Sequence, residues 1–274
     1  MTNWKRFKKI IVQKSLIFFY DRINKGILFN TYIRILKITK LFKSNLDINK
    51  KVIKDFKNPF FLSRKSRFYM YSDGLNNRLE HLFNEYLLKQ IKFNDNDLII
   101  DCGANIGELG YYLNYKFGIK NVIAIEPDKQ EFEKLRLNTN YSNYLPLNYA
   151  LYNKNGEIDF YLNNETADSS VFANKSLTQV SVKTITLNEL FNKQNIKKCK
   201  LLKLEAEGAE PEILKGGLEV LKHIEYISVD CGAERGINNE ITVAPVSKTI
   251  HELNFSLIDA GGVRKILLFK NNLF

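Results

Sequence analysis

Beyond residue 75, apolar residues recur along the chain with two different periods. From 75 to 91 they are spaced by three or four residues, which predicts a helix with one apolar face. After residue 96, short apolar runs alternate with amphipathic segments, a pattern typical of an α/β fold with a mainly parallel sheet and helices on both faces. The predicted strands cover 97–102, 121–126, 145–151, 200–205 and 224–230, and the predicted helices cover 107–116, 129–139, 187–192, 210–222 and 246–254. A hairpin around 157–162 and 179–184 and a terminal strand pair near 256–260 and 264–270 complete the pattern.

The first 69 residues have a different pattern. Over residues 4–43, basic residues alternate with apolar groups spaced by three and four, which predicts amphipathic helices. Lys14, Asp21 and Arg22 interrupt the apolar run, so it is too short to span a bilayer. No small-residue cleavage site follows, so a secretory signal is not expected. We therefore expect a basic helical arm with a polar connector over residues 1–69, followed by the α/β domain over 70–274.

Charge separates the same two parts. Residues 1–58 contain 15 Lys or Arg and 3 Asp or Glu, a balance of +12, whereas the rest of the chain holds 26 basic and 27 acidic residues. The arm either packs on the domain with a solvated basic face or lies on an anionic membrane surface, with Trp4 and phenylalanines as apolar anchors. It could also bind nucleic acid or form a dimer, although its aromatic residues form no RNA-binding motif.

The turn after the first strand of the domain carries the clearest chemistry. The strand ends at Asp101, and glycines follow at 103, 107 and 110. Gly103 permits a sharp turn with a close backbone approach, and Gly107 permits close packing of the helix start. Glu126 ends the next strand, where a carboxylate can hold both ribose hydroxyls of an adenosine.

Two nucleoside cofactors compete for such a site. Dinucleotide binding uses the spacing G-x-G-x-x-G, whereas this chain has G-x-x-x-G-x-x-G with Ala104 and Asn105 between the first two glycines. Asp101 would repel a pyrophosphate but suits a cationic ligand with an amino group. The loop therefore favours S-adenosylmethionine over NAD.

Several segments together resemble the FkbM-type methyltransferase family over roughly residues 70–270. They are 97–110, 123–128, 148–152, 156–160, 168–170 and 202–210, with 74–78 and 229–236 similar to extensions in a subset. The resemblance implies a Rossmann-like class I methyltransferase fold, with a mainly parallel sheet and an antiparallel terminal strand. It also implies methyl transfer, usually to a hydroxyl of a sugar or natural product. Glu205 departs from the family, which usually has Asp there.

Methylation of a hydroxyl requires a base, because the hydroxyl pKa lies far above 7. Glu205 and Glu207 are two residues apart at a strand end, so in extended geometry both would point to one face. They are candidates for base and orienter, or, together with Asp230, for binding a divalent cation. The longer side chain of Glu205 leaves open that it is structural and that Glu207 has the polar role. Metal dependence stays open.

The remaining roles follow from the resemblance. The residues expected to bind S-adenosylmethionine are Asp101, Gly103, Asn105, Gly107, Glu126, Asp128, Ala150 and Leu151, with the last two as the adenine wall. The residues expected on the substrate side are Arg78, Asp168, Ser169, Glu234 and Arg235. Methylation of a nucleobase nitrogen is disfavoured, because Glu-Ala-Glu-Gly stands where such enzymes place an Asn/Asp-Pro-Pro-aromatic loop. The three cysteines have no metal-binding spacing and are expected to be small buried residues in a reducing cytoplasm.

We therefore expect a cytoplasmic O-methyltransferase acting on a saccharide or glycolipid in surface polysaccharide or related glycoconjugate biosynthesis. If the arm binds lipid, the enzyme would be peripheral at the inner membrane face. Two different functions also fit the sequence: an RNA ribose methyltransferase with the arm binding phosphate, and a non-catalytic cofactor-binding scaffold. Nucleic acid is the less favoured partner because the α/β domain is nearly neutral. A homo-oligomer is compatible with the sequence.

Overall fold

The computed structural model describes residues 10–12, 14–18, 27–140, 144–163, 169–172, 177–261 and 264–274. The chain forms two compact units, residues 1–81 and 82–274. Among the described residues, no helix is both long enough and apolar enough to cross a bilayer. Trp4 and Phe7, two of the aromatic residues expected to anchor the arm, lie outside the described residues.

The first unit combines helices with a small antiparallel sheet. Residues 10–12 and 14–18 are helical, and α2 (Ile27–Ile38) follows. The segment expected to be a connector instead contains a three-stranded sheet of β1 (Leu46–Asp47), β2 (Val52–Ile53) and β3 (Phe60–Phe61), and then a 3-10 helix (Lys65–Tyr71). Ile53, Phe60 and Tyr71 are almost completely buried, so short apolar pairs within a polar segment form this core. The helix α3 (Leu75–Glu85) crosses the boundary between the units.

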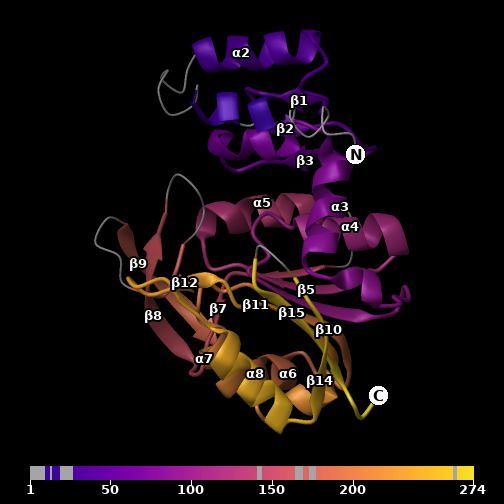
Figure 1. Ribbon diagram of the computed structural model, residues 1–274, viewed down its shortest axis with the longest axis vertical. Coiled ribbons are helices and arrows are strands. Elements are labelled where there is room, and N and C mark those ends of the chain that lie inside the picture. The colour runs from indigo at the N-terminus through magenta and orange to yellow at the C-terminus, as the bar shows by residue number, and fades with distance from the viewer. Residues whose placement is uncertain are drawn as a thin grey trace. The chain divides into compact units, whose positions relative to one another are not determined.

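The second unit is built on a seven-stranded sheet in the order β14-β15-β11-β10-β4-β5-β6 (Figure 1). Its strands are β4 (Leu98–Cys102), β5 (Asn121–Ile125), β6 (Leu145–Leu147), β10 (Cys199–Leu204), β11 (Ile224–Asp230), β14 (Phe255–Ala260) and β15 (Ile266–Asn271). The five strands from β6 to β11 are parallel, and β15 runs antiparallel to both of its neighbours. This sheet order confirms the Rossmann-like fold with an antiparallel terminal strand.

Helices cover both faces of this sheet, as Figure 1 shows. One face carries α4 (Glu108–Phe117) and α5 (Lys129–Thr139), and the other carries α6 (Leu187–Lys193), α7 (Glu210–Lys215) and α8 (Val243–Glu252). A second sheet contains β7 (Ala150–Leu151), β8 (Gly156–Leu162) and β9 (Thr178–Ile185). The strands β12 (Ala233–Arg235) and β13 (Glu240–Ile241) form a separate pair.

Three predicted elements end earlier than expected. The expected strand over 145–151 is divided between β6 and β7, which belong to different sheets. The helix expected over 210–222 stops at Lys215, where two glycines, which disfavour helix, follow; a Cβ at Gly216 would lie 2.4 Å from the carbonyl oxygen of Tyr152. The helix expected over 75–91 stops at Glu85, and Leu87 has a left-handed φ of 61°.

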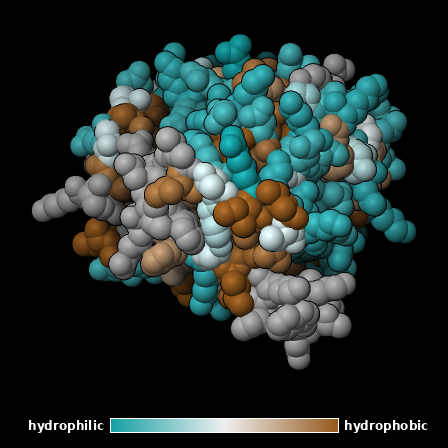
Figure 2. Space-filling view, turned by 90° about the horizontal axis from the view of Figure 1, so that it is seen from above, coloured by the Kyte–Doolittle hydropathy of each residue, from teal (hydrophilic) through white to brown (hydrophobic). Residues whose placement is uncertain are grey.

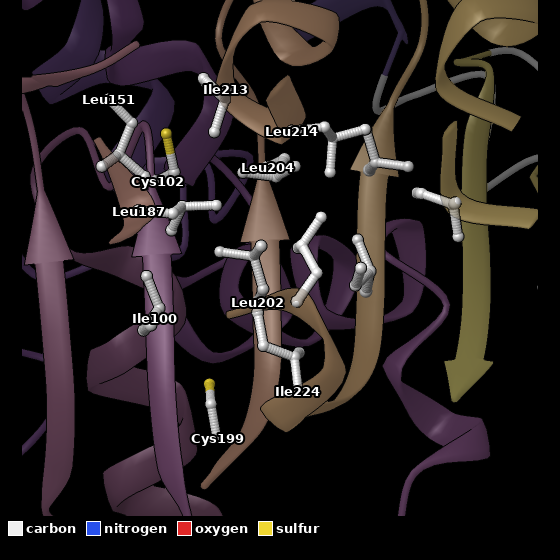
Figure 3. Packing of buried hydrophobic residues seen from close by; sticks show 14 of the residues in the cluster. Ile100, Cys102, Leu151, Leu187, Cys199, Leu202, Leu204, Ile213, Leu214 and Ile224 are labelled. Atoms are coloured by element: carbon white, nitrogen blue, oxygen red, sulfur yellow. The ribbon is translucent and has the colours of Figure 1, made fainter. Parts of the chain in front are cut away.

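The central strands divide the sheet into an apolar face and a partly polar face. Ile100 and Cys102 of β4, with Leu202 and Leu204 of β10, belong to the buried cluster that packs against α6 and α7 (Figure 3). Burying one large aliphatic side chain contributes about 1.5–3 kcal/mol, so this cluster supplies much of the stability of the sheet. Residues at the intervening positions point to the opposite face, because side chains alternate along a strand. Asp101 and Lys203 occupy two of these positions.

Candidate active site at the carboxyl edge of the sheet

A buried row of polar residues crosses the middle of the sheet. Asp101, Lys203 and Ser228 are neighbours in register on β4, β10 and β11, and each is at most 2% exposed. The Lys203 ammonium lies 3.1 Å from Asp101 Oδ1 and 3.2 Å from Glu205 Oε2. It also donates hydrogen bonds to the carbonyls of Cys102 and Gly103, at 2.9 and 2.8 Å. Burial alone would lower the pKa of Lys203, but the two carboxylates raise it above its usual value, so the ammonium stays charged.

Removing this ammonium is expected to destabilise the second unit strongly. In Lys203→Met, Asp101 would remain buried without its cation, and breaking a buried ion pair from one side costs about 3–5 kcal/mol. Urea unfolding of both proteins measures this difference. Lys193→Met is the matched control, because its exposed pair with Glu189 should contribute less than about 1 kcal/mol. Equal losses for the two variants would contradict a central role for Lys203.

Gly103 is required by the packing of two strand ends. Its φ is 71°, and a Cβ at this position would lie 2.0 Å from the carbonyl oxygen of Glu205. The backbones of the loop after β4 and of the segment after β10 are therefore in direct contact. Gly107 has a φ of 87°, and a Cβ there would lie 2.8 Å from Leu135 of α5. Both predicted glycine positions thus combine a left-handed φ with a close approach, in each case to a neighbouring part of the protein.

The substitution Gly103→Ala is expected to be one of the most destabilising single-methyl additions in this chain. It combines left-handed strain of about 1–2 kcal/mol with a clash against backbone, so we expect a total loss above about 3 kcal/mol. Gly236→Ala is the control, because its φ is 65° but a Cβ would meet nothing within 4 Å. Urea midpoints that fall equally for both variants would show that the close approach to Glu205 has no energetic importance.

Glu205 is held by three groups at once. The Tyr86 hydroxyl donates to Oε2, the Arg264 guanidinium donates to Oε1, and the Lys203 ammonium lies beside Oε2. Burial alone would raise the pKa of Glu205, but Lys203 and Arg264 outweigh it and hold the pKa well below its usual range. The carboxylate is therefore ionised near neutral pH and has little tendency to accept a proton.

Arg264 connects Glu205 to the end of β11. Its guanidinium also pairs with Asp230, whose Oδ1 accepts a hydrogen bond of 2.9 Å from Gly232 N. The guanidinium thus bonds two of the three residues named as candidate ligands of a divalent cation. Within the described residues, no three His, Cys, Asp or Glu side chains are grouped so that they could hold a metal ion.

The predicted pairing of Glu205 and Glu207 on one strand face is wrong. The strand β10 ends at Leu204, and Glu207 has a left-handed φ of 51°, so the two residues do not share an extended segment. The tight turn is stabilised by Glu210, whose Oε1 accepts hydrogen bonds from Ala206 N and Gly208 N. Ser170 Oγ donates to the Glu207 carbonyl at 3.1 Å, which brings the chain after β8 to this turn.

Glu234 is the most exposed of the three carboxylates around Arg264, ahead of Glu205 at 22% and Asp230 at 0%. Its side chain is 28% exposed, and Oε1 lies 3.9 Å from the Arg264 guanidinium. A Cβ on Gly232 would lie 3.1 Å from Asp230 Oδ1 and 3.5 Å from Glu234 Oε1, so the two carboxylates flank the same backbone position. Burial and the charge of Asp230 raise the pKa of Glu234 to about 8. A carboxyl group with this pKa can exchange a proton near neutral pH.

The neighbouring Arg235 has a different partner. Its guanidinium forms a two-pronged ion pair with Glu212 at 2.6 and 2.8 Å and donates to the Gly208 carbonyl at 2.6 Å. It also lies over the Phe172 ring, 4.6 Å from the ring centroid. Arg235 therefore fixes β12 to α7 and to the chain near Phe172, and so holds the adjacent Glu234 in place.

Glu126 is tied to the predicted cofactor loop. The Asn105 backbone N–H donates to Oε2 and the Asp128 backbone N–H donates to Oε1, both at 2.8 Å. Burial raises the pKa of Glu126 to about 8, although these two donors act against the shift. Each carboxylate oxygen can accept a further hydrogen bond, so the arrangement fits a diol such as a ribose. Asn148, which the sequence analysis did not identify as a site residue, donates to the Glu126 carbonyl at 2.8 Å.

Other predicted cofactor residues have structural partners. Asp128 is the N-cap of α5 and accepts a hydrogen bond of 2.8 Å from Gln130 N. Leu151 is 3% exposed and belongs to the buried apolar cluster. Ala150 is 6% exposed and pairs with Thr184 of β9.

Four of the five predicted substrate residues lie within the described part of the chain. Glu234 and Arg235 lie on β12 beside the cluster, and Ser169 accepts a hydrogen bond of 2.9 Å from Asn163 N. Asp168 lies outside the described residues, and Arg78 lies on the part of α3 that belongs to the first unit. All three cysteines are buried free thiols, as predicted.

Sequence analysis missed three residues of the cluster: Tyr86, Lys203 and Arg264. A charged residue between Leu202 and Leu204 in a buried strand was a signal for Lys203, because a lysine is almost never buried without a partner. Tyr86 and Arg264 are 119 and 59 residues from Glu205 along the chain, so no local pattern indicated them.

Comparison with known proteins identifies the family. The sequence model of a protein family, the methyltransferase FkbM domain, matches residues 101–242, slightly more than half of the chain. The hexuronic acid methyltransferase AglP of Haloferax volcanii is 29% identical over 167 residues, which are 58% of this chain and 67% of AglP.

Solved structures give more distant matches. A methyltransferase FkbM from Methylobacillus flagellatus matches 76% of this chain with 14% identity and a TM-score of 0.47. This chain spans about half of that protein, 54% of its length. The magnesium protoporphyrin IX methyltransferase of Synechocystis, solved with bound S-adenosylmethionine, matches 97% of both chains with 10% identity and a TM-score of 0.45.

Proposed function

The chain belongs to the family of FkbM methyltransferase domains, and we propose that it transfers a methyl group from S-adenosylmethionine to a hydroxyl of a sugar. Its membership makes it a methyltransferase that uses S-adenosylmethionine. The observation that carries the proposal is the placement of two carboxylates, Glu126 and Glu234, which follow strand ends at the carboxyl edge of one parallel sheet. Ligands of open α/β sheets bind at this edge.

The residues present fit the cofactor. Glu126 is 6% exposed, and each of its oxygens accepts one backbone hydrogen bond, so the carboxylate is oriented and still able to accept from ribose hydroxyls. Bound S-adenosylmethionine supplies an electrophilic methyl group on a sulfonium. The protein must align the acceptor oxygen with it, and alignment of this kind contributes on the order of 7 kcal/mol or more.

We infer that Glu234 is the general base that accepts the proton of the sugar hydroxyl. The proton passes from the hydroxyl oxygen to a Glu234 oxygen as the oxygen–carbon bond forms and the carbon–sulfur bond breaks. Glu205 is unsuited to this step because Lys203, Arg264 and Tyr86 stabilise its ionised form. Glu207 is the alternative base, and comparing Glu234→Gln with Glu207→Gln distinguishes the two.

The relative AglP supports a saccharide acceptor, since its name describes methylation of a hexuronic acid. We propose that the acceptor is a sugar of a surface polysaccharide or a related glycoconjugate. Incubation of the protein with methyl-labelled cofactor and a panel of saccharides, glycolipids and RNA tests this proposal. We expect label in a saccharide fraction, and label only in RNA would favour a ribose methyltransferase instead.

A non-catalytic scaffold is the competing function. In that case, the protein would bind the cofactor without transferring label to any acceptor, and Glu234→Gln would leave its cellular function intact. Loss of O-methylated sugar in cells that carry Glu234→Gln would exclude the scaffold.

A further inference from the structure

The helix α2 has two apolar faces, and only one of them is used in the core. Phe29, Ile33 and Leu36 are at most 4% exposed and form the buried face. On another side of the helix, Leu28, Ile35 and Ile38 are 62%, 51% and 81% exposed. At 100° per residue these three positions fall within one stripe, which we call the exposed stripe of α2. A core helix needs only one apolar face, so the stripe is not explained by folding.

The preceding helical segment repeats this arrangement. Val12 and Leu16 are buried, whereas four large apolar residues are exposed: Ile10, Ile11, Ile17 and Phe18. The Tyr32 hydroxyl donates a hydrogen bond of 2.7 Å to Ser15 Oγ, which joins this segment to α2. Two helical segments of the same unit therefore both expose apolar side chains. Figure 2 shows one face of the molecule, on which brown apolar residues gather beside teal polar ones.

The charged residues of α2 and the segment after it are all basic. Between residues 27 and 43 the sequence has four basic residues and no acidic one. Arg34 and Lys40 are exposed, and Arg34 borders the stripe on the helical wheel. Lys37 donates a hydrogen bond to the Leu46 carbonyl, and Lys43 forms an ion pair with Asp73. A protein partner would require a complementary acidic and apolar surface, whereas an anionic lipid surface offers both properties over any area.

We propose that the exposed stripe of α2, with its basic flank, binds the surface of an anionic lipid bilayer. The helices would lie in the plane of the interface, with Leu28, Ile35 and Ile38 among the acyl chains and Arg34 and Lys40 at the headgroups. The proposal is independent of the acceptor, because it concerns the first unit alone. It would bring the enzyme to acceptors that are attached to lipids.

Vesicle flotation of the full chain tests this proposal. We expect the protein to float with vesicles of phosphatidylglycerol and phosphatidylcholine, less with phosphatidylcholine alone, and less as salt increases. Replacing Leu28, Ile35 and Ile38 together by Gln should weaken binding at least tenfold. Replacing Arg34 and Lys40 by Gln should weaken binding to anionic vesicles several-fold and reduce its salt dependence.

The matched control replaces Leu218, Leu257 and Leu273 by Gln, because these residues are also exposed but lie in the second unit. It should bind vesicles as the unchanged protein does, and circular dichroism with urea unfolding verifies that all variants are folded. Absence of flotation by the unchanged protein would overturn the proposal, as would equal flotation of the two triple variants. A dimer in sedimentation that only the α2 variant loses, without vesicle binding, would instead identify the stripe as a contact between two copies.

Discussion

Replacing Glu234 by Gln is expected to lower kcat for methyl transfer by about 10²- to 10⁴-fold, the usual contribution of a general base. The amide keeps the shape of the side chain but cannot accept the proton. Binding of S-adenosylhomocysteine should be unchanged, because Glu234 is not among the residues that fit the cofactor. Initial rates with labelled cofactor measure the effect.

The pH dependence should identify the same residue. Glu234 faces Asp230 of β11, Arg264 before β15, Glu205 after β10 and Glu210 of α7, and burial together with Asp230 raises its pKa to about 8. A base must be deprotonated to act, so kcat/KM for the acceptor should rise with pH and level off above about 8, when it is measured at saturating cofactor so that Glu126, whose pKa is also about 8, does not contribute. In Glu234→Gln this rise should be absent.

Two further variants serve as controls. Glu240→Gln changes an exposed carboxylate on the strand paired with β12 and should leave the rate and its pH profile unchanged. Glu207→Gln tests the alternative base. If Glu207→Gln loses the pH-dependent rise and Glu234→Gln keeps it, the assignment of Glu234 is refuted.

Replacing Glu126 by Ala is expected to weaken the binding of S-adenosylhomocysteine at least 100-fold. Above its pKa of about 8 Glu126 is ionised, and each hydrogen bond to an ionised group contributes about 1.5–3 kcal/mol, so in a titration at about pH 9 the variant lacks two such bonds to the ribose. The Asn105 and Asp128 N–H groups would also lose their acceptor, so the loop would be less well fixed. Calorimetric titration of the two proteins gives the ratio of their Kd values.

Glu133→Ala is the control for this experiment, because Glu133 is an exposed carboxylate on the neighbouring helix α5. Its Kd should equal that of the unchanged protein. A Glu126→Ala variant that binds with unchanged affinity would place the cofactor elsewhere and would remove the basis for assigning the site.

The order of strands and helices in the second unit followed from the sequence, because buried parallel strands are short apolar runs and the helices between them are amphipathic. The break between β6 and β7 could not be predicted from the sequence. Asn148 donates hydrogen bonds to the carbonyls of Glu126 and Pro127, so the chain leaves the central sheet after Leu147. This contact connects residues more than 20 positions apart, which no local period can indicate.

The cofactor side of the site was more predictable than the reacting side. Gly103 and Glu126 lie in local strand–turn motifs. In the structure Gly103 lies against the Glu205 carbonyl, and Glu126 accepts a hydrogen bond from the Asn105 backbone N–H. The environment of Glu205 depends on Tyr86 and Arg264, which approach it from distant elements. The left-handed φ of Glu207 could not be predicted either, because nothing in the sequence indicates that the strand ends at Leu204. Charges brought together by tertiary structure therefore shift the pKa values of these carboxylates, and the proposal that Glu234 accepts the proton rests on those shifts.

The most direct measurement of the proposed reaction is the position of the transferred methyl group in the product. The protein would be incubated with S-adenosylmethionine carrying a ¹³C-labelled methyl group and with the saccharides of the acceptor panel, including uronic acids. Two-dimensional NMR of the purified product should show the label as a methyl ether, correlated with a ring carbon that carried a hydroxyl. Label found as a methyl ester, on nitrogen, or in no saccharide of the panel would contradict O-methylation of a sugar hydroxyl.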